Sequence, residues 1–248
     1  MRIVFPEIEN PIIKEALGLT PEVETVPADD IDEACRILAN RDAEAMIAGI
    51  DYTSRDVILG ARDIVGATGK TFSSCFVLER GEEKIIIADG ATCKNPTEEQ
   101  LFDIVCQTFE TAKHIFPEPK IAMLSFSTLG SGGHDDSMTK IQNVITKVRA
   151  ERPEIVIDGE MQLDAAVNPR VAEKKAPGSK VAGKANVLIC PDLNSGNILY
   201  KALEQFGGFV AAGPILQGFK KPISDLSRGS TVEDVVLVIK TIERIVNG

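Results

Sequence analysis

Short apolar runs alternate with amphipathic segments along almost the whole chain. The runs are rich in Ile, Val and Ala, which is typical of buried strands, and the segments between them repeat apolar residues at helical spacing. Such alternation predicts an α/β fold with mostly parallel sheets. The predicted strands are RIVFPE, EAMIAGI, SSCFVLE, KIIIADG, KIAMLSF, EIVIDGE, NVLICPD and FVAAGPI, and the predicted helices are Pro11–Leu17, Ile31–Ala39, Ser54–Val65, Thr97–Phe116, Ser137–Ala150, Ala165–Lys175 and Asn197–Phe206.

A last helix is predicted to begin near Thr231, where apolar residues again recur at helical spacing up to Val246. A hydroxyl at Ser230 or Thr231 can accept an N–H of the first turn. Glu233 lies three residues after Ser230 and Asp234 three after Thr231, so either pair could form a capping box.

The loop before this helix, FKKPISDLSRG, presents Ser227 and Arg228 just ahead of its first turn. A cation, a hydroxyl, the carboxylate of Asp234 and free N–H groups would then share one helix end. Such a group could hold an anion and move a proton. The alternative is an ordinary capped helix with a solvated arginine.

Two breaks in the pattern suggest domain boundaries. GATGK, residues 66–70, interrupts the alternation, and Gly213–Pro214 marks a second break. We expect residues 1–66 and 213–248 to form one discontinuous domain and residues 67–212 to form a second α/β domain.

Composition narrows the class of protein. The chain has 248 residues, of which 44% are hydrophobic, so it should be globular. A formal net charge of −10 argues against nucleic acid as a partner. No apolar run is long enough to span a membrane, and MRIVFPEIEN does not resemble a signal peptide. Five scattered cysteines without a CxxC pair suggest reduced thiols in a cytoplasmic protein.

Polar, glycine-rich chain follows the strand that ends in LSFSTLGSGGHDD, residues 124–136. Ligands of open α/β sheets bind at the carboxyl ends of strands, and glycines permit a phosphate to approach the backbone closely. Ser125, Ser127 and Thr128 end the strand, and Gly130, Gly132 and Gly133 follow, so a phosphate could bind here; the alternative is a flexible loop between strand and helix. His134-Asp135-Asp136 is not assigned to a metal, because consecutive side chains diverge.

The strand in NVLICPDLNSGN is followed in the same way by a polar helix start. Asn194, Gly196 and Asn197 could bind an anion or an amide there, whereas the alternative is simple capping by Asn194 or Ser195. GATGKT is not a P-loop, because Ile64 stands where the first glycine is required. Cys93 has no evident imidazole partner and is interpreted as a structural thiol.

Four stretches together resemble the phosphate acetyltransferase and butyryltransferase family: MLSFSTLGS, IDGEMQLDAAVNP, VAGKANVLICPDLNSGNILYKAL and GPILQGFKKPISDLSRGSTVEDVV. The resemblance runs from about Ala45 to the C-terminus. It implies a two-domain α/β/α sandwich related to isocitrate dehydrogenase, commonly dimeric. It also implies transfer of an acyl group between coenzyme A and inorganic phosphate, through an acyl phosphate, with no metal and no permanently bound cofactor.

The resemblance also implies roles for particular residues. Ser227 would contribute a hydrogen bond near the reacting thiol, Arg228 would bind phosphate or the developing oxyanion, and Asp234 would be the general base toward the thiol of coenzyme A. The residues implied to bind substrate are Ser127, Thr128, Gly130, Ser131, Asn194, Gly196, Asn197 and Gln217.

The chain departs from the family pattern between Leu17 and Ala45, where family members usually carry a longer segment. A reduced first domain is therefore expected, with apolar surface that a second copy would cover in a homodimer. Further departures are Gly90, Cys93, Thr71 and Tyr52. The missing segment favours one alternative, a non-catalytic acyl-CoA-binding or regulatory protein of the same fold, and the shared architecture suggests a second, a decarboxylating dehydrogenase. The second would need a metal-binding Asp cluster, which the sequence does not contain.

Overall fold

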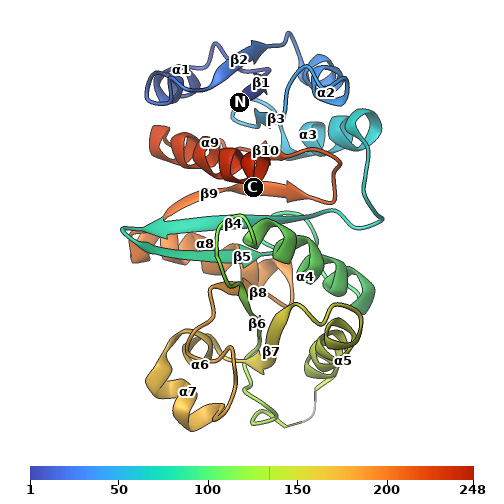
Figure 1. Cartoon of the computed structure of the whole chain (residues 1–248), viewed down its shortest axis with the longest axis vertical. Helices are drawn as coiled ribbons and strands as arrows, with labels where there is room; N and C mark the ends of the chain where they lie inside the picture. Colours follow the sequence, from blue (N-terminus) through green and yellow to red (C-terminus); the bar gives the residue numbers. More distant parts are fainter. Residues whose placement is uncertain (134) are drawn as a thin grey trace. The chain divides into compact units, whose positions relative to one another are not determined.

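The computed structural model describes residues 1–133 and 135–248, and these form two compact units. The first contains residues 1–77 and 210–248, and the second contains residues 78–209 (Figure 1). The junction between residues 209 and 210 lies close to the expected boundary at 212/213. The junction between residues 77 and 78 lies further from the expected boundary at 66/67. The assignment of the two units as separate domains stays a prediction.

The first unit contains five complete strands in the order β2-β1-β3-β10-β9. All neighbours run parallel except β10 and β9, which are antiparallel. The bounds are β1 Arg2–Phe5, β2 Glu24–Pro27, β3 Ala45–Ala48, β9 Val210–Gln217 and β10 Ile223–Asp225. A further strand, β4 (Ser73–Arg80), begins in this unit and ends in the second.

Helices cover this sheet through their apolar faces. Met46, Leu38, Val57 and Ile223 share one buried cluster, which joins β3 and β10 to the helices beside them. The helix α9 packs against β9 and α1. The helices are α1 Pro11–Gly18, α2 Ile31–Ala39, α3 Ser54–Gly60 with the π-helical turn η1 Ala61–Val65, and α9 Val232–Asn247.

The second unit is built on four parallel strands in the order β5-β8-β6-β7. Their bounds are β5 Glu83–Ala88, β6 Lys120–Leu124, β7 Val156–Met161 and β8 Val187–Ile189. Figure 1 shows α4 and α8 on opposite sides of β5. The helices are α4 Glu98–Ala112, α5 Asp136–Glu151, α6 Leu163–Val167, α7 Pro169–Lys175 and α8 Leu193–Gly207.

All eight predicted strands are present, and four details differ from the sequence prediction. Two short strands, β2 and β10, were not predicted. The helix predicted over Ala165–Lys175 is two helices, because Asn168 caps α7 and Pro169 cannot continue α6. The helix predicted from Asn197 begins at Leu193, since the side chain of Asp192 accepts the Ser195 N–H at its start. The helix predicted to reach Phe116 ends at Ala112.

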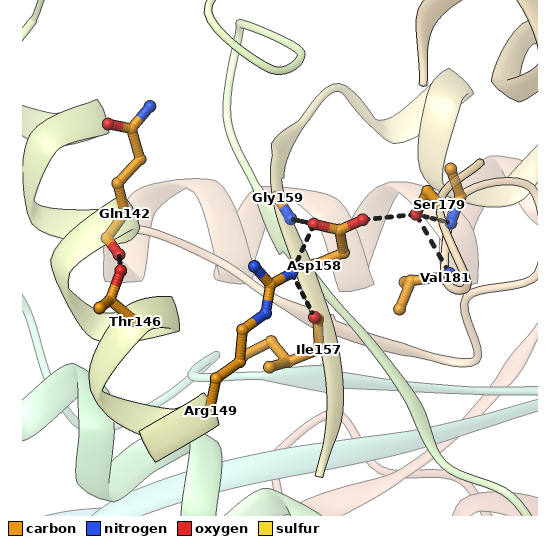
Figure 2. A network of polar contacts seen from close by, with 9 residues as sticks. Gln142, Thr146, Arg149, Ile157, Asp158, Gly159, Ser179 and Val181 are labelled. Carbon is orange, nitrogen blue, oxygen red and sulfur yellow. Dashed lines mark hydrogen bonds and ion pairs between the residues drawn. The ribbon is translucent and has the colours of Figure 1, made fainter. Parts of the chain in front are cut away.

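One carboxylate, Asp158 in β7, joins three parts of the second unit (Figure 2). Arg149 of α5 donates from Nη2 to Asp158 Oδ1 at 2.9 Å, and the Ser179 hydroxyl donates to Oδ2 at 2.6 Å. Ser179 Oγ in turn accepts the Val181 N–H at 3.1 Å. The network fixes the chain that leads into β8.

The start of α8 packs tightly on the loop after β5. A Cβ on Gly196 would lie 2.0 Å from the Asp89 carbonyl oxygen, which is far inside van der Waals contact. Asn197 Nδ2 donates to the Gly90 carbonyl at 3.1 Å. The backbone approach therefore requires glycine at position 196.

Gly196→Ala is expected to lower the free energy of unfolding by about 1–3 kcal/mol, because the methyl group must push α8 away from the Asp89 loop. Gly18→Ala is the matched control, since Gly18 ends α1 with nothing within 4 Å of an added Cβ. Urea denaturation measures both. Equal unfolding free energies for the two variants would contradict the close approach.

Candidate active site

The start of α9 is held by a capping box. Asp234 N–H donates to Thr231 Oγ1 at 3.2 Å, and Thr231 N–H donates back to Asp234 Oδ2 at 2.8 Å. Of the two predicted boxes, the structure contains the one between Thr231 and Asp234. The cap uses Oδ2 of the Asp234 carboxylate, whose side chain is half-buried beside the preceding turn.

That turn, residues 227–230, is ordered by its own serines. Ser227 N–H donates to Ser230 Oγ at 3.0 Å, and Ser230 N–H donates to the Ser227 carbonyl at 2.9 Å. Gly229 N–H donates to Ser227 Oγ at 3.3 Å. Arg228 is exposed, and its side chain makes no ion pair with any residue that the structure describes. The turn thus presents an unpaired cation close to the Asp234 carboxylate in sequence.

The chain that leads into this turn is held against the end of β3. Asp225 pairs with Ala48 at the ends of β10 and β3, and the next N–H, that of Leu226, donates to the Ala48 carbonyl at 2.5 Å. Gly49 follows with φ +114°, and a Cβ there would lie 2.6 Å from the Leu226 carbonyl oxygen. Glycine is needed at position 49 for both its backbone conformation and this close approach.

Two buried carboxyl groups lie beside Gly49: Glu7 accepts its N–H, and Asp225 Oδ1 would lie 2.4 Å from a Cβ there. Glu7 is 5% exposed and Asp225 is 2% exposed. Burial raises the pKa of Asp225 to about 6; a hydrogen bond from the Ser54 hydroxyl opposes the rise, and the charge of Glu7 adds to it. Asp225 Oδ1 is buried and accepts no hydrogen bond from the described part of the chain. The Glu7 carboxylate instead accepts N–H groups from Gly49 at 2.8 Å, Ile50 at 3.3 Å, Asp51 at 2.5 Å and Tyr52 at 3.0 Å.

In the second unit, the loop after β6 is folded around a buried carboxylate. Ser127, which is fully buried, donates from Oγ to Glu160 Oε1 at 2.9 Å and accepts the Gly132 N–H at 2.8 Å. Gly130 N–H donates to the same Glu160 oxygen at 2.7 Å. Thr128 is 3% exposed, and its N–H donates to Ser131 Oγ at 3.0 Å.

Glu160 is therefore the organising residue of this loop. Burial alone would raise the pKa of Glu160, but hydrogen bonds from Gly130, Gln142 and Ser127 outweigh it, and the pKa is lowered. Because the Ser127 hydroxyl and the Gly130 N–H already donate to the ionised Glu160 carboxylate, they are not available to bind a phosphate. A ligand at this loop would meet its exposed outer side, which includes Gly130 and Ser131.

The other candidate residues occupy two further places. Asn194 is exposed in the first turn of α8, with Asn197 half-buried beside it. The side-chain cap is Asp192, so capping by Asn194 or Ser195 is wrong as the alternative explanation. Gln217 ends β9 in the first unit, is 5% exposed, and accepts a hydrogen bond from Ser73 Oγ at 2.9 Å. The buried Gln217 side chain therefore stabilises the end of β9 through its hydrogen bond with Ser73.

The structure thus groups the candidates by unit. Ser227, Arg228 and Asp234 lie together at the start of α9 in the first unit. In the second unit, Ser127, Thr128, Gly130 and Ser131 share one loop, and Asn194, Gly196 and Asn197 share one helix start. Sequence reasoning missed Glu7, Asp225 and Glu160, whose one available signal was a carboxylate inside or beside an apolar run.

Within residues 1–133 and 135–248, no three His, Cys, Asp or Glu side chains gather as a metal site would need, and no helix is long and apolar enough to cross a membrane. In the stretch His134-Asp135-Asp136, which was not assigned to a metal, His134 lies outside the described residues and Asp135 caps α5. All five cysteines are free thiols, and burial raises the pKa of Cys93, with the charge of Asp89 adding to it.

Of the eight large exposed hydrophobic side chains among the described residues, seven lie in the second unit. Leu19 is the one large exposed hydrophobic residue of the first unit among the described residues. The expectation of apolar surface on a reduced first domain is therefore wrong, because the short helices there bury their apolar faces. The second unit exposes Phe126, Leu129, Val156, Leu163, Val167, Ile198 and Phe206.

A family of known proteins matches the part of the chain that contains all of these candidate site residues. The sequence matches the family described as phosphate acetyl/butaryl transferase over residues 13–242. A phosphate acetyltransferase of Treponema pallidum (strain Nichols) is 42% identical over 219 residues, which are 84% of this chain and 65% of that protein. One from Clostridium acetobutylicum is 43% identical over 237 residues, which are 92% of this chain and 71% of the relative. The chain spans about two thirds of the length of these curated relatives.

Solved structures agree. A phosphotransacetylase from Streptococcus pyogenes superposes with a TM-score of 0.86 at 31% identity, covering 99% of this chain and 94% of that one. A 4-hydroxythreonine-4-phosphate dehydrogenase from Klebsiella pneumoniae shares the fold alone, with a TM-score of 0.61, 12% identity, and 99% of each chain covered. The predicted dehydrogenase-like α/β fold class is confirmed, and the chain belongs to the phosphate acetyl/butaryl transferase family.

Proposed function

We propose that this protein transfers an acetyl or other short acyl group between coenzyme A and inorganic phosphate, with the acyl phosphate as the other acyl carrier. Family membership supports the reaction class. The observation that carries the proposal is the arrangement at the start of α9, where the exposed and unpaired Arg228 precedes a helix whose first turn contains Asp234. A free guanidinium on an ordered turn suits an anionic substrate.

In the direction that forms acyl-CoA, the thiol of coenzyme A attacks the carbonyl carbon of the acyl phosphate. Asp234 accepts the thiol proton, for which Oδ1 is the oxygen that the capping box leaves free. A carbon–sulfur bond forms, negative charge collects on the carbonyl oxygen, and the carbon–oxygen bond to phosphate then breaks. Arg228 stabilises the oxyanion and the leaving phosphate, and the Ser227 hydroxyl donates a hydrogen bond toward the sulfur.

The remaining candidates are proposed to bind or shape the substrate site. The outer side of the loop, at Gly130 and Ser131, and the start of α8, at Asn194 and Asn197, offer exposed or half-exposed polar groups. The other proposed residues act from buried positions, by holding the backbone in shape: Ser127, Thr128, Gly196 and Gln217. No metal ion and no permanently bound cofactor takes part in this scheme.

Assembly and location are also proposals. We propose a cytoplasmic homodimer that buries apolar side chains of the second unit. Phe206 is 93% exposed and Ile198 is 68% exposed, and both project from α8. An apolar helix face of this kind is more stable when a second copy covers it. Light scattering that shows a monomer at micromolar concentration would remove the dimer from the proposal.

Arg228→Ala is expected to lower turnover by about 10²- to 10³-fold with little change in Tm, since the guanidinium stabilises charge in the transition state and contacts no part of the core. The assay follows acetyl-CoA formation from acetyl phosphate and coenzyme A. Arg170→Ala is the control, because Arg170 is likewise exposed. Near wild-type turnover by a folded Arg228→Ala protein would sink the assignment, and saturable coenzyme A binding without acyl transfer by the wild type would favour a non-catalytic binding protein.

Asp234→Asn is expected to keep the helix start, because an amide oxygen can still accept the Thr231 N–H, while slowing removal of the thiol proton. The loss in kcat should shrink as pH rises toward the thiol pKa of about 8.5, where free thiolate becomes available. The same assay, repeated from pH 6 to pH 9, measures it, with Glu233→Gln as the exposed neighbouring control. An equal fractional loss at every pH would mean that Asp234 acts through the cap alone.

A further inference from the structure

A cavity of about 380 Å³ lies along the outer edge of β7 in the second unit. β7 is the last strand in the sheet order, so no strand among the described residues pairs with this edge. Arg149, in the last turn of α5, lines the cavity, and so does the segment of residues 178–181 that precedes β8. Binding sites for small molecules have volumes of about 300–1,000 Å³, so the cavity is large enough for a ligand.

The carboxylate that lines the cavity, Asp158, is already bound by the protein. Its Oδ1 accepts hydrogen bonds from Arg149 Nη2 at 2.9 Å and from the Gly159 N–H at 3.0 Å (Figure 2). Its Oδ2 accepts the Ser179 hydroxyl at 2.6 Å. Asp158 is therefore not a free ligand for a cation.

Two cations line the same cavity with hydrogen-bond donors to spare. Arg149 uses only Nη2, which donates to Asp158 and to the Ile157 carbonyl at 3.0 Å. A guanidinium carries five N–H donors, so those on Nε and Nη1 remain without a partner in the described part of the chain. The ammonium group of Lys180 is exposed and makes no hydrogen bond or ion pair with any residue that the structure describes.

The balance of charge in the cavity is the reverse of that of the whole chain. Two positive side chains and one negative side chain line it, whereas the chain carries a formal net charge of −10. The next carboxylate along the chain, Glu154, does not line the cavity and pairs with Arg152 at 2.6 Å. The cavity therefore favours an anion, and a single negative charge neutralises it.

Most of the remaining lining is apolar and consists of Pro153, Ile155, Val156, Ile157 and Val181. Val156 is 38% exposed although it lies in a strand. Apolar ligand surface that covers Val156 removes both surfaces from water, which is favourable. Inorganic phosphate has no such surface, so the lining favours an anion with a hydrocarbon part.

We infer that this cavity binds a small organic carboxylate. The carboxylate group contacts Lys180 and the free N–H groups of Arg149, because a guanidinium matches the two carboxylate oxygens in shape and charge. The hydrocarbon part covers Val156 and Pro153. None of the residues proposed for acyl transfer lines the cavity, and the inference does not rest on the proposed function.

Lys180→Glu tests the inference without removing a contact of the fold. The probe is 3-phenylpropionate, and its equilibrium binding is measured by saturation-transfer difference NMR. We expect the charge reversal to weaken binding by at least about tenfold, because the carboxylate loses one cation and meets an anion. Lys184→Glu is the matched control, since Lys184 is exposed in the same segment but does not line the cavity. At about 0.15 M salt, where more distant charges are screened, the control is expected to change binding less than about twofold.

Two competitors separate the charge of the ligand from its hydrocarbon part, and they need only the wild-type protein. The amide 3-phenylpropionamide has the same hydrocarbon part without the charge, and inorganic phosphate has charge without the hydrocarbon part. Each is expected to displace the carboxylate at least about tenfold less effectively than unlabelled carboxylate does. An amide that competes equally well would overturn the inference.

Arg228→Ala separates the cavity from the candidate active site. This variant is expected to bind 3-phenylpropionate within about twofold of the wild type, because Arg228 does not line the cavity. Binding that is lost in Arg228→Ala but kept in Lys180→Glu would place the carboxylate at the start of α9 and overturn the inference. The absence of saturable binding up to about 10 mM would overturn it as well. A wild-type protein without acyl transfer overturns the proposed function alone.

Discussion

The buried carboxylate of Glu7 fixes the part of the first unit on which the rest depends. Its two oxygens accept the N–H groups of residues 49–52, which follow β3 and lie in neither a strand nor a helix. The left-handed Gly49 in that segment lets Leu226 approach. The end of β10, the Ser227–Arg228 turn and the capped start of α9 all follow from this one anchored loop.

The second unit uses the same device. The Glu160 carboxylate accepts hydrogen bonds from the Ser127 hydroxyl and the Gly130 N–H of the loop after β6. In the same way, Glu7 accepts the backbone N–H groups that follow β3. In both places a buried carboxyl group replaces the water that would otherwise solvate irregular backbone. At Glu160 the hydrogen bonds also lower the pKa of the carboxyl group. The consequence for function is that the loop is preformed, so binding energy is not used to order it.

Much of this could be predicted from the sequence, because apolar runs and helical spacing are local signals. The strands, the helix start at Thr231 and the Thr231–Asp234 cap all come from residues within a few positions of one another. β10 was missed because ISD is too short to show a period, and α8 was started too late because Asp192 caps it directly after Pro191. Glu7 and Glu160 could not be found, since their donors lie 42–45 and 18–33 residues away.

The account makes coenzyme A an obligatory acyl acceptor, with Asp234 acting on its thiol, Arg228 acting on the acyl phosphate, and no acyl-enzyme intermediate. Isotope exchange tests this most directly. Labelled inorganic phosphate is incubated with unlabelled acetyl phosphate and the protein, with and without a catalytic amount of coenzyme A. The account predicts that label enters acetyl phosphate only when coenzyme A is present. Exchange without coenzyme A, or no exchange in its presence, would contradict it.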